Sequence, residues 1–339
     1  MRSLRTVFLI LLLITASIFI MSLFSCANMD TGNKAGANAE DETSESRSAE
    51  ISVIDSPEII GYDSYIVTST APYEQPPLPE AYYMFRDDTS KQYGQTKKIT
   101  VSGKVIDLKC DSTVRSPTRG YVLNNYSGKS EDGYVRASFD SETGRMISYQ
   151  FSQKYVSDRE EKISDGHTNV FLTEQELIDY AESVLKEYTG VSVNGCDVQI
   201  LSTVYTDNDI QNSDEFVPNG DKDIGYRIDF KKSISNIELL NCAYVRVEPE
   251  TGVFTEFEMS FDFERYKPYE NVQIDREKLD SALLKYYGRV AYDPVPDLKL
   301  FVYNDELWVR AVYMNRIPYG DHYHNYAFYC FSKLAEIVK

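Results

Sequence analysis

Two segments far apart in the chain carry the same short pattern, which is typical of a β-hairpin. The sequence Tyr-Val-Arg at 134–136 leads to Glu-Thr-Gly at 142–144, and both tripeptides return at 244–246 and 250–252. Apolar residues alternate with polar ones around each turn, and glycine accepts the positive φ of tight hairpin turns. A weaker third copy begins at Trp308 and lacks the Thr-Gly turn. The pattern therefore predicts antiparallel strands joined by short turns.

A helix is expected before the second and the third of these strand regions. Thr173 is a favourable N-cap, Glu176 completes a capping box, and Gly190 ends the first helix. Its apolar side chains form one stripe: Leu177, Tyr180, Ala181, Val184, Leu185 and Tyr188. Asp275 begins a second such helix, which ends at Gly288. The predicted fold class is α+β, with antiparallel sheets and single helices packed on one face, in two to three repeated units.

A helix followed by strands with a Glu-Thr-Gly hairpin resembles the PepSY-type domain of bacterial envelope proteins and peptidase propeptides. The resemblance covers residues 173–262 and, less closely, 99–151 and 275–333. It implies a non-catalytic module that binds or restrains a partner, often a peptidase. The family has no catalytic set to carry over to residues of this chain.

The amino terminus has the form of an export signal. Arg2 and Arg5 precede an uncharged segment, 6–25, that is dense in Leu, Ile and Phe. The sequence Leu-Phe-Ser-Cys at 23–26 resembles the lipobox of bacterial lipoproteins, although a residue smaller than phenylalanine is usual at its second position. The resemblance implies lipidation of Cys26. The alternative is an uncleaved signal anchor, since the segment is long enough to span a bilayer.

The chain divides into five predicted segments. Residues 1–25 form a lipoprotein signal peptide, and 26–50 form a disordered acidic tether, because 27–50 contains no Val, Ile, Leu or aromatic residue. The body follows as a mostly-β unit at 51–165, a helix-plus-hairpin unit at 166–268 and a second helix-plus-strands unit at 269–339. We expect this body to lie outside the cytoplasm, attached to the cell membrane through the amino-terminal lipid.

Charge and aromatic content restrict the partners of the body. The net charge of −18 argues against nucleic acid and against an anionic lipid surface, because both require a basic face. The 27 tyrosines against one tryptophan favour half-buried strand surfaces. A Tyr-lined groove for a sugar or a peptide is the functional alternative.

Two groups of residues have some of the character of metal sites. His322 and His324 lie two residues apart, so on a strand they share a face, with Asp321 nearby. A polar turn, which Pro318 and Gly320 support, explains these residues better than a metal site, since no third strong ligand is visible. Asp207 and Asp209 have the spacing of a calcium loop, but the EF-hand pattern fails at its sixth and twelfth positions. A long acidic hairpin loop explains them better, and His167 fits a solvated loop.

Cysteine parity leaves two interpretations open. With Cys26 set aside for lipid, the remaining four permit two disulfides in three pairings: Cys110, Cys196, Cys242 and Cys330. Cys110 and Cys330 also alternate in phase with apolar residues, as buried core cysteines do. None of the four has a CxxC partner, and the chain lacks GxSxG, HExxH, Walker and GxGxxG motifs.

The sequence therefore leaves three hypotheses about function. The leading one is a non-enzymatic binding or regulatory lipoprotein without a cofactor, with an envelope protein as its partner. The second is a lipoprotein that captures a small solute or glycan on tyrosine side chains, and it predicts a concave Tyr-lined pocket. The third is a hydrolase, which requires two or three carboxylates that converge in a cleft.

Overall fold

The computed structural model describes most of the body of the protein. The described residues are 50–64, 78–130, 133–153, 169–205, 209–220, 224–240, 242–249, 251–260, 263–287, 295–319 and 322–338, with the side chains of 153, 263 and 315–324 excepted. They belong to one compact unit, Ser48–Lys339. Within them no helix is both long enough and apolar enough to cross a membrane. The predicted leader, Cys26 and nearly all of the tether lie outside the described residues.

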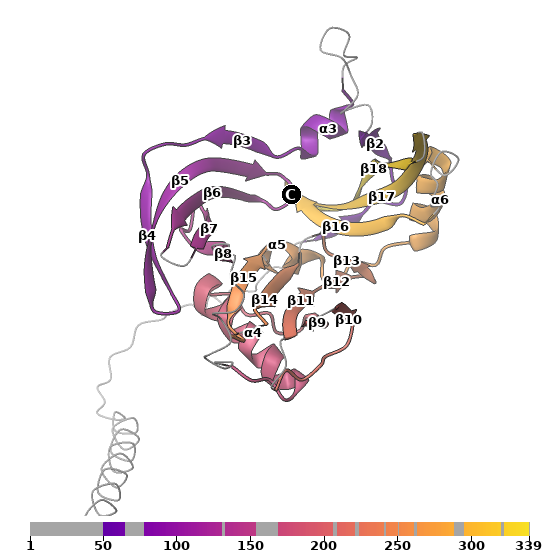
Figure 1. The fold of residues 1–339 in the computed structure, drawn as a ribbon. Helices are drawn as coiled ribbons and strands as arrows, with labels where there is room; N and C mark the ends of the chain where they lie inside the picture. Colours follow the sequence, from indigo (N-terminus) through magenta and orange to yellow (C-terminus); the bar gives the residue numbers. More distant parts are fainter. Residues whose placement is uncertain are drawn as a thin grey trace, which may run out of the picture. The chain divides into compact units, whose positions relative to one another are not determined.

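The largest element is a sheet of eleven strands in which every pair is antiparallel (Figure 1). Its strand order is β10-β9-β11-β14-β15-β8-β7-β6-β5-β3, with β4 also paired to β5. In chain order, its first six strands are β3 (Asp88–Lys91), β4 (Thr96–Val101), β5 (Lys104–Ser116), β6 (Tyr121–Lys129), β7 (Gly133–Asp140) and β8 (Met146–Gln153). The other five are β9 (Asp197–Tyr205), β10 (Ile210–Ser213), β11 (Ile224–Lys231), β14 (Ala243–Val247) and β15 (Phe254–Met259).

A second sheet combines the two ends of the body. It contains β1 (Ile51–Val53), β2 (Ile60–Asp63), β16 (Asp297–Tyr303), β17 (Glu306–Tyr319) and β18 (His322–Ile337). Both β1 and β2 pair with β18, so residues that we assigned to the first unit complete the sheet of the last one. A small hairpin of β12 (Ser233–Ile234) and β13 (Ile237–Glu238) adjoins β16, where the Leu240 amide donates to the Leu300 carbonyl at 2.7 Å.

Helices are few among the described residues: α3 (Glu80–Phe85), α4 (Glu174–Thr189), α5 (Phe263–Tyr266), the 3₁₀ helix η2 (Lys267–Tyr269) and α6 (Arg276–Tyr287). The predicted capping box of α4 is confirmed, because the Glu176 amide donates to Thr173 Oγ1 at 3.3 Å and the Thr173 amide donates to Glu176 Oε2 at 3.0 Å. Gly190 ends α4 in the left-handed conformation. At α6 the Lys278 amide donates to Asp275 Oδ1. The architecture is thus mostly antiparallel sheet with few helices.

The two Thr-Gly turns share one hydrogen-bond pattern. In the turn from β7 to β8, the Thr143 hydroxyl donates to Asp140 Oδ2 at 2.5 Å and accepts from the Arg145 amide. In the turn from β14 to β15, the Thr251 hydroxyl donates to Glu248 Oε2 at 2.9 Å and accepts from the Val253 amide. The glycine that follows each threonine has a positive φ, as the hairpin prediction required.

These two hairpins lie next to each other because β8 pairs with β15. The register opposes Gln150 to Glu256, with Tyr149 opposite Phe257 and Ser148 opposite Glu258. Strands from both predicted units therefore form one continuous sheet. No local pattern in the sequence indicates this pairing, since α4 and six described strands, β9 to β14, lie between the two partners in the chain.

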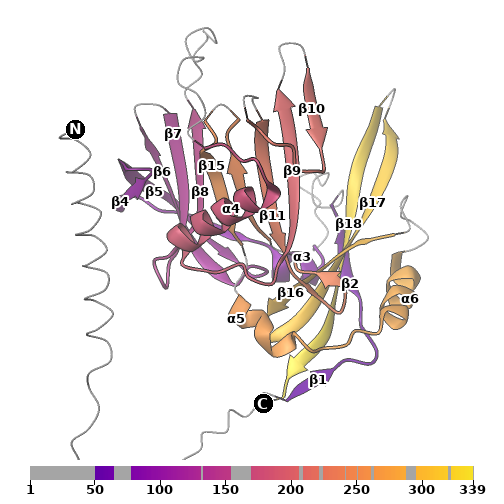
Figure 2. The ribbon, with the colours of Figure 1, turned by 90° about the horizontal axis from the view of Figure 1, so that it is seen from below.

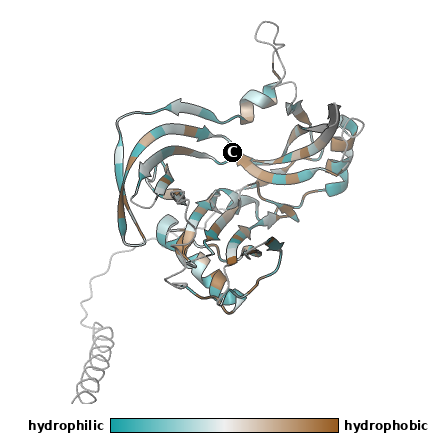
Figure 3. Cartoon of the chain, in the orientation of Figure 1, coloured by the Kyte–Doolittle hydropathy of each residue, from teal (hydrophilic) through white to brown (hydrophobic). Residues whose placement is uncertain are grey.

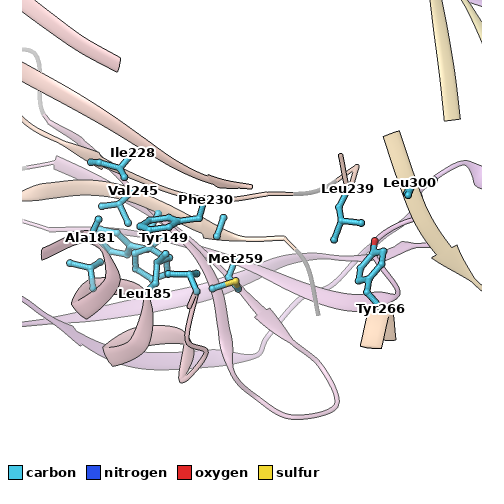
Figure 4. Close-up of a cluster of buried hydrophobic side chains, with 14 of the residues drawn as sticks. Tyr149, Ala181, Leu185, Ile228, Phe230, Leu239, Val245, Met259, Tyr266 and Leu300 are labelled. Carbon is cyan, nitrogen blue, oxygen red and sulfur yellow. The ribbon is translucent and has the colours of Figure 1, made fainter. Parts of the chain in front are cut away.

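One face of the long sheet is apolar, and α4 lies against it at strands β8, β14 and β15 (Figure 2). A row of opposed residues crosses eight strands on this face, and all eight are buried: Ile200, Ile228, Val245, Phe257, Tyr149, Ala137, Tyr126 and Cys110. In Figure 4, Ala181 and Leu185 of α4 pack near Tyr149 of the sheet. Hydrophobic and hydrophilic residues alternate along several strands in Figure 3, as a sheet with one buried face requires.

Candidate functional site

The opposite face of the long sheet is polar across most of its width. Two rows of opposed residues flank the buried row. The first row, from β9 to β5, is Leu201, Arg227, Arg246, Glu256, Gln150, Arg136, Ser127 and Lys109. The second row is Gln199, Asp229, Tyr244, Glu258, Ser148, Ser138, Asn125 and Ser112. Because side chains alternate between faces along a strand, both rows point away from α4.

A groove of about 460 Å³ lies on this polar face. Short polar side chains from the neighbouring strands β5, β6, β7 and β8 line it, namely Ser112, Asn125, Ser138 and Ser148. Longer side chains stand around them, including Tyr134, Arg136, Gln150, Tyr244, Glu256 and Glu258. The difference in side-chain length makes the face concave. The lining also includes Asp111, which has no opposed residue because the register between β5 and β6 shifts between Cys110 and Ser112.

Hydrogen bonds connect the small side chains of the groove. Ser138 Oγ donates to Asn125 Oδ1 at 2.8 Å, and Asn125 Nδ2 donates to Ser112 Oγ at 3.2 Å. The three residues lie on the neighbouring strands β7, β6 and β5. Each is only partly buried, so the groove presents an ordered line of hydroxyl and amide groups to a ligand.

Ion pairs and one tyrosine order the other side of the groove. Arg227 Nε lies 2.9 Å and 3.2 Å from the two carboxylate oxygens of Asp229, and the Arg227 guanidinium carbon lies 4.2 Å from the centre of the Tyr244 ring. The Tyr244 hydroxyl donates to Glu256 Oε1 at 2.6 Å, and Arg246 Nη1 lies 3.4 Å from Glu256 Oε2. These contacts join side chains from three adjacent strands, β11, β14 and β15.

Burial and charge change the pKa values of two of these groups. Burial raises the pKa of the Tyr244 hydroxyl, and its hydrogen bond to Glu256 raises it further, so the phenol remains a donor. Burial alone would lower the pKa of Arg227, but the Asp229 carboxylate outweighs that effect and the pKa is raised. The two side chains are therefore held in their protonated forms, with their hydrogen bonds to Glu256 and Asp229 in place.

A second pocket, of about 590 Å³, lies on the same sheet near the Thr251 turn, which joins β14 to β15. Arg227 and Arg246 both line it, together with Thr203, Asn212 and Thr255. The two arginines are directly opposed across β11 and β14. Since like charges in opposed positions are unfavourable, their carboxylate partners Asp229 and Glu256 are needed to hold them there.

The metal-site predictions fall largely beyond the residues that the structure describes. The backbone of His322 and His324 begins β18 and pairs with the end of β17, while their side chains and the whole of Asp321 lie outside the described residues. His167 and Asp207 also lie outside them. Asp209 is described, and its carboxylate accepts from the Ile210 amide. Among the described residues, no group of three or more His, Cys, Asp or Glu side chains could hold a metal ion.

The four body cysteines are free thiols. Cys110 and Cys330 are buried, as the interpretation as core residues requires. Burial raises the pKa of Cys196 to about 11 and that of Cys330 to about 12. Raised pKa values keep these thiols protonated near neutral pH, so neither has the character of a nucleophile.

Sequence reasoning missed the residues of the groove, although their spacing was visible. In β7, Arg136 and Ser138 alternate with the buried Val135, Ala137 and Phe139. The alternation predicts which residues face the core. The polar residues between them match no sequence motif, so the alternation did not identify them as site residues. Only the pairing of β8 with β15 brings them close to Glu256 and Glu258. None of the known protein families, curated proteins or solved structures compared with this chain matches it.

Proposed function

We propose that this protein is a membrane-anchored, extracytoplasmic binding protein that takes a polar ligand, a small solute or glycan, in the groove on the polar face of its long sheet. The observation that carries the proposal is the groove itself. It is concave, it lies on rigid strands, and it is lined by ordered hydroxyl, amide, carboxylate and guanidinium groups beside Tyr134 and Tyr244. Sites with several fixed polar groups on a rigid scaffold are typical of specific small-ligand binding.

Binding fits the carboxylates of the groove better than hydrolysis does. Glu256 already accepts from the Tyr244 hydroxyl and pairs with Arg246. Glu258 pairs with Arg119 at 3.1 Å and accepts a hydrogen bond from the Ser260 hydroxyl. A general acid or nucleophile needs a carboxylate that is free to exchange a proton or to attack a substrate. These two carboxylates instead act as fixed hydrogen-bond acceptors.

The proposed location, outside the cytoplasm and attached to the cell membrane, rests on the amino-terminal sequence. The apolar segment 6–25 exports the chain, and acyl chains on Cys26 attach the body to the cell membrane. We also propose that the body contains repeated PepSY-like units, each with a helix on one sheet face. The matching hydrogen bonds of the Thr143 and Thr251 turns support this repeat. A Cys26→Ala variant should lose metabolic lipid labelling, and unchanged labelling would remove the lipid anchor.

Ligand-induced thermal shifts test the binding function. The purified full chain is screened against monosaccharides, oligosaccharides, amino acids and nucleosides, since a ligand that binds only the folded state raises Tm. At least one compound should raise Tm, and Ser148→Trp, which fills the groove, should abolish the shift. Val105→Trp adds the same ring at a site that is 67% exposed and outside the groove, so it should keep the shift. A shift that survives in Ser148→Trp would contradict the proposed site.

A protein partner from the cell envelope is the second candidate function. The edge strand β10 opposes Ile210 to Tyr205 of β9, and Ile210 is 60% exposed. An exposed apolar pair beside an edge strand is suited to a protein contact. Pull-down from the envelope with the full chain should enrich a protein that Ile210→Lys loses. If the full chain and the Ile210→Lys variant enrich the same protein equally, strand β10 is not the contact surface.

A further inference from the structure

Three ion pairs lie in or beside the groove. Arg119 Nη1 lies 3.1 Å from Glu258, and Arg246 Nη1 lies 3.4 Å from Glu256. Next to them, Arg227 is bound through Nε to both oxygens of Asp229. Asp229 is 7% exposed, so its charge is compensated by Arg227 rather than by water.

The groove is therefore close to electrically neutral within a strongly acidic chain. Its lining contains the carboxylates of Asp111, Glu256 and Glu258 and the guanidinium of Arg136. The guanidiniums of Arg119 and Arg246 pair with two of those carboxylates, which gives three charges of each sign. The whole chain carries −18, so the excess negative charge lies elsewhere.

A charged ligand would disturb these ion pairs. A carboxylate or phosphate placed near Arg227 and Arg246 would also lie near Asp229 and Glu256, which repel it. An ammonium group near Glu258 would meet Arg119 in the same way. Displacing either partner would leave a partly buried charge uncompensated, which is unfavourable. These three ion pairs therefore favour neither an anion nor a cation.

An uncharged ligand with many hydroxyl groups fits the same surface without disturbing it. The hydroxyls of Ser138 and Ser148 and the amide of Gln150 each offer donors and acceptors, and a ligand hydroxyl is both. Bonds to Glu256 or Arg136 would be charge-assisted, and so stronger than bonds between neutral groups. The lining residues come from six neighbouring strands, β5, β6, β7, β8, β15 and β14, a width of about 24 Å at the usual strand spacing. That width exceeds a single sugar ring.

We infer that the groove binds a neutral oligosaccharide laid across strands β6, β7, β8 and β15, with its hydroxyls on the side chains of Ser138, Ser148 and Gln150. The inference rests on the proposed function and specifies its ligand class. Because the recognition does not depend on net charge, affinity should respond little to salt. A ligand with a uronic-acid carboxylate or a free amine should bind more weakly than its neutral counterpart.

The test is a binding assay of the detergent-solubilised full chain on matched oligosaccharides. Neutral oligosaccharides are compared with uronic-acid and de-N-acetylated amino-sugar counterparts of equal length, at about 50 mM and about 500 mM NaCl. The strongest binders should be neutral, with Kd changing less than about twofold with salt and with charged counterparts about tenfold weaker. A preference for an acidic or a basic oligosaccharide, or a tenfold loss of affinity at high salt, would overturn the inference.

Paired substitutions separate failure of the inference from failure of the proposed function. Asn125→Ala and Ser138→Ala should each weaken binding about tenfold, because each removes a hydrogen-bonding side chain of the groove. Thr113→Ala removes a similar hydrogen bond, 2.7 Å to Asn124, on the other face of β5 and β6, and it should leave Kd unchanged. If charged oligosaccharides bind more tightly and Asn125→Ala weakens their binding, the neutral ligand class is refuted but the proposed site is not. No binding, or binding insensitive to Asn125 and Ser138, would refute the proposed site as well.

Discussion

The two faces of the long sheet are built from alternate residues of the same strands, yet different forces hold them. On the α4 face, Tyr149 and Phe257 are opposed and buried, and the Tyr188 ring of α4 stacks on Phe257 with ring centres 5.5 Å apart. On the other face, the neighbouring Gln150 and Glu256 belong to a partly exposed polar groove. The comparison indicates that the α4 face carries most of the stability of this region, and that the groove face, where we propose the ligand binds, contributes less.

The largest effect is expected on the α4 face. Phe257→Ala should lower the free energy of unfolding by about 3–5 kcal/mol, because it removes a fully buried ring and leaves a cavity under α4. Gln150→Ala, on the adjacent strand and the opposite face, should cost about 0.5 kcal/mol or less. Urea unfolding of the two variants measures both values. Similar losses of unfolding free energy in the two variants would mean that the groove face contributes as much to stability as the α4 face.

The two Thr-Gly turns sharpen the comparison. A Cβ on Gly252 would lie 2.3 Å from the Asn169 carbonyl oxygen in the segment leading to α4, whereas a Cβ on Gly144 would meet no atom within 4 Å. Gly252→Ala should therefore cost about 3 kcal/mol, from backbone strain plus the displaced segment, and Gly144→Ala about 1 kcal/mol, from backbone strain alone. Unfolding midpoints measure the difference. Equal costs would show that the contact with Asn169 is easily relaxed.

Alkaline pH should destabilise the α4 face. Burial raises the pKa of Tyr149 from 10.0 to about 12, so the folded state keeps a proton that the unfolded state releases. The stability linked to this proton is complete below pH 10 and is lost as the pH rises towards 12. Tyr149→Phe should reduce the fall in unfolding free energy over this range by about 1–2 kcal/mol. If the unfolding free energy of Tyr149→Phe falls with pH as steeply as that of the unsubstituted protein, the destabilisation comes from tyrosines other than Tyr149.

The smallest effect on stability should accompany a clear effect on binding. Ser138→Ala removes a partly exposed hydroxyl and its hydrogen bond to Asn125, so the unfolding free energy should change by about 0.5 kcal/mol or less. The same substitution should weaken oligosaccharide binding about tenfold. Calorimetry of unfolding and of binding on one protein preparation tests both. A large loss of stability with unchanged affinity would reverse the assignment of the two faces.

Local features of this chain could be predicted from its sequence, and long-range pairings could not. The Thr173 capping box, the Gly190 helix end and both Thr-Gly turns depend on residues close in the chain, and all were predicted. The pairing of β8 with β15 and of β1 with β18 joins segments far apart, where many strands of similar composition compete. The groove needs the first of these pairings. Its small residues, Ser138 and Ser148 among them, form no motif until the strands are aligned.

A structure of the complex tests the central claim most directly. Crystals of the full chain with its tightest neutral oligosaccharide should show the sugar on the sheet face opposite α4, with hydroxyls within hydrogen-bond distance of Ser138, Ser148 and Gln150. The positions of α4 and of the buried row beneath it should be unchanged. A sugar bound on the second sheet, or on the α4 side, would contradict the division of the long sheet into a stabilising face and a binding face.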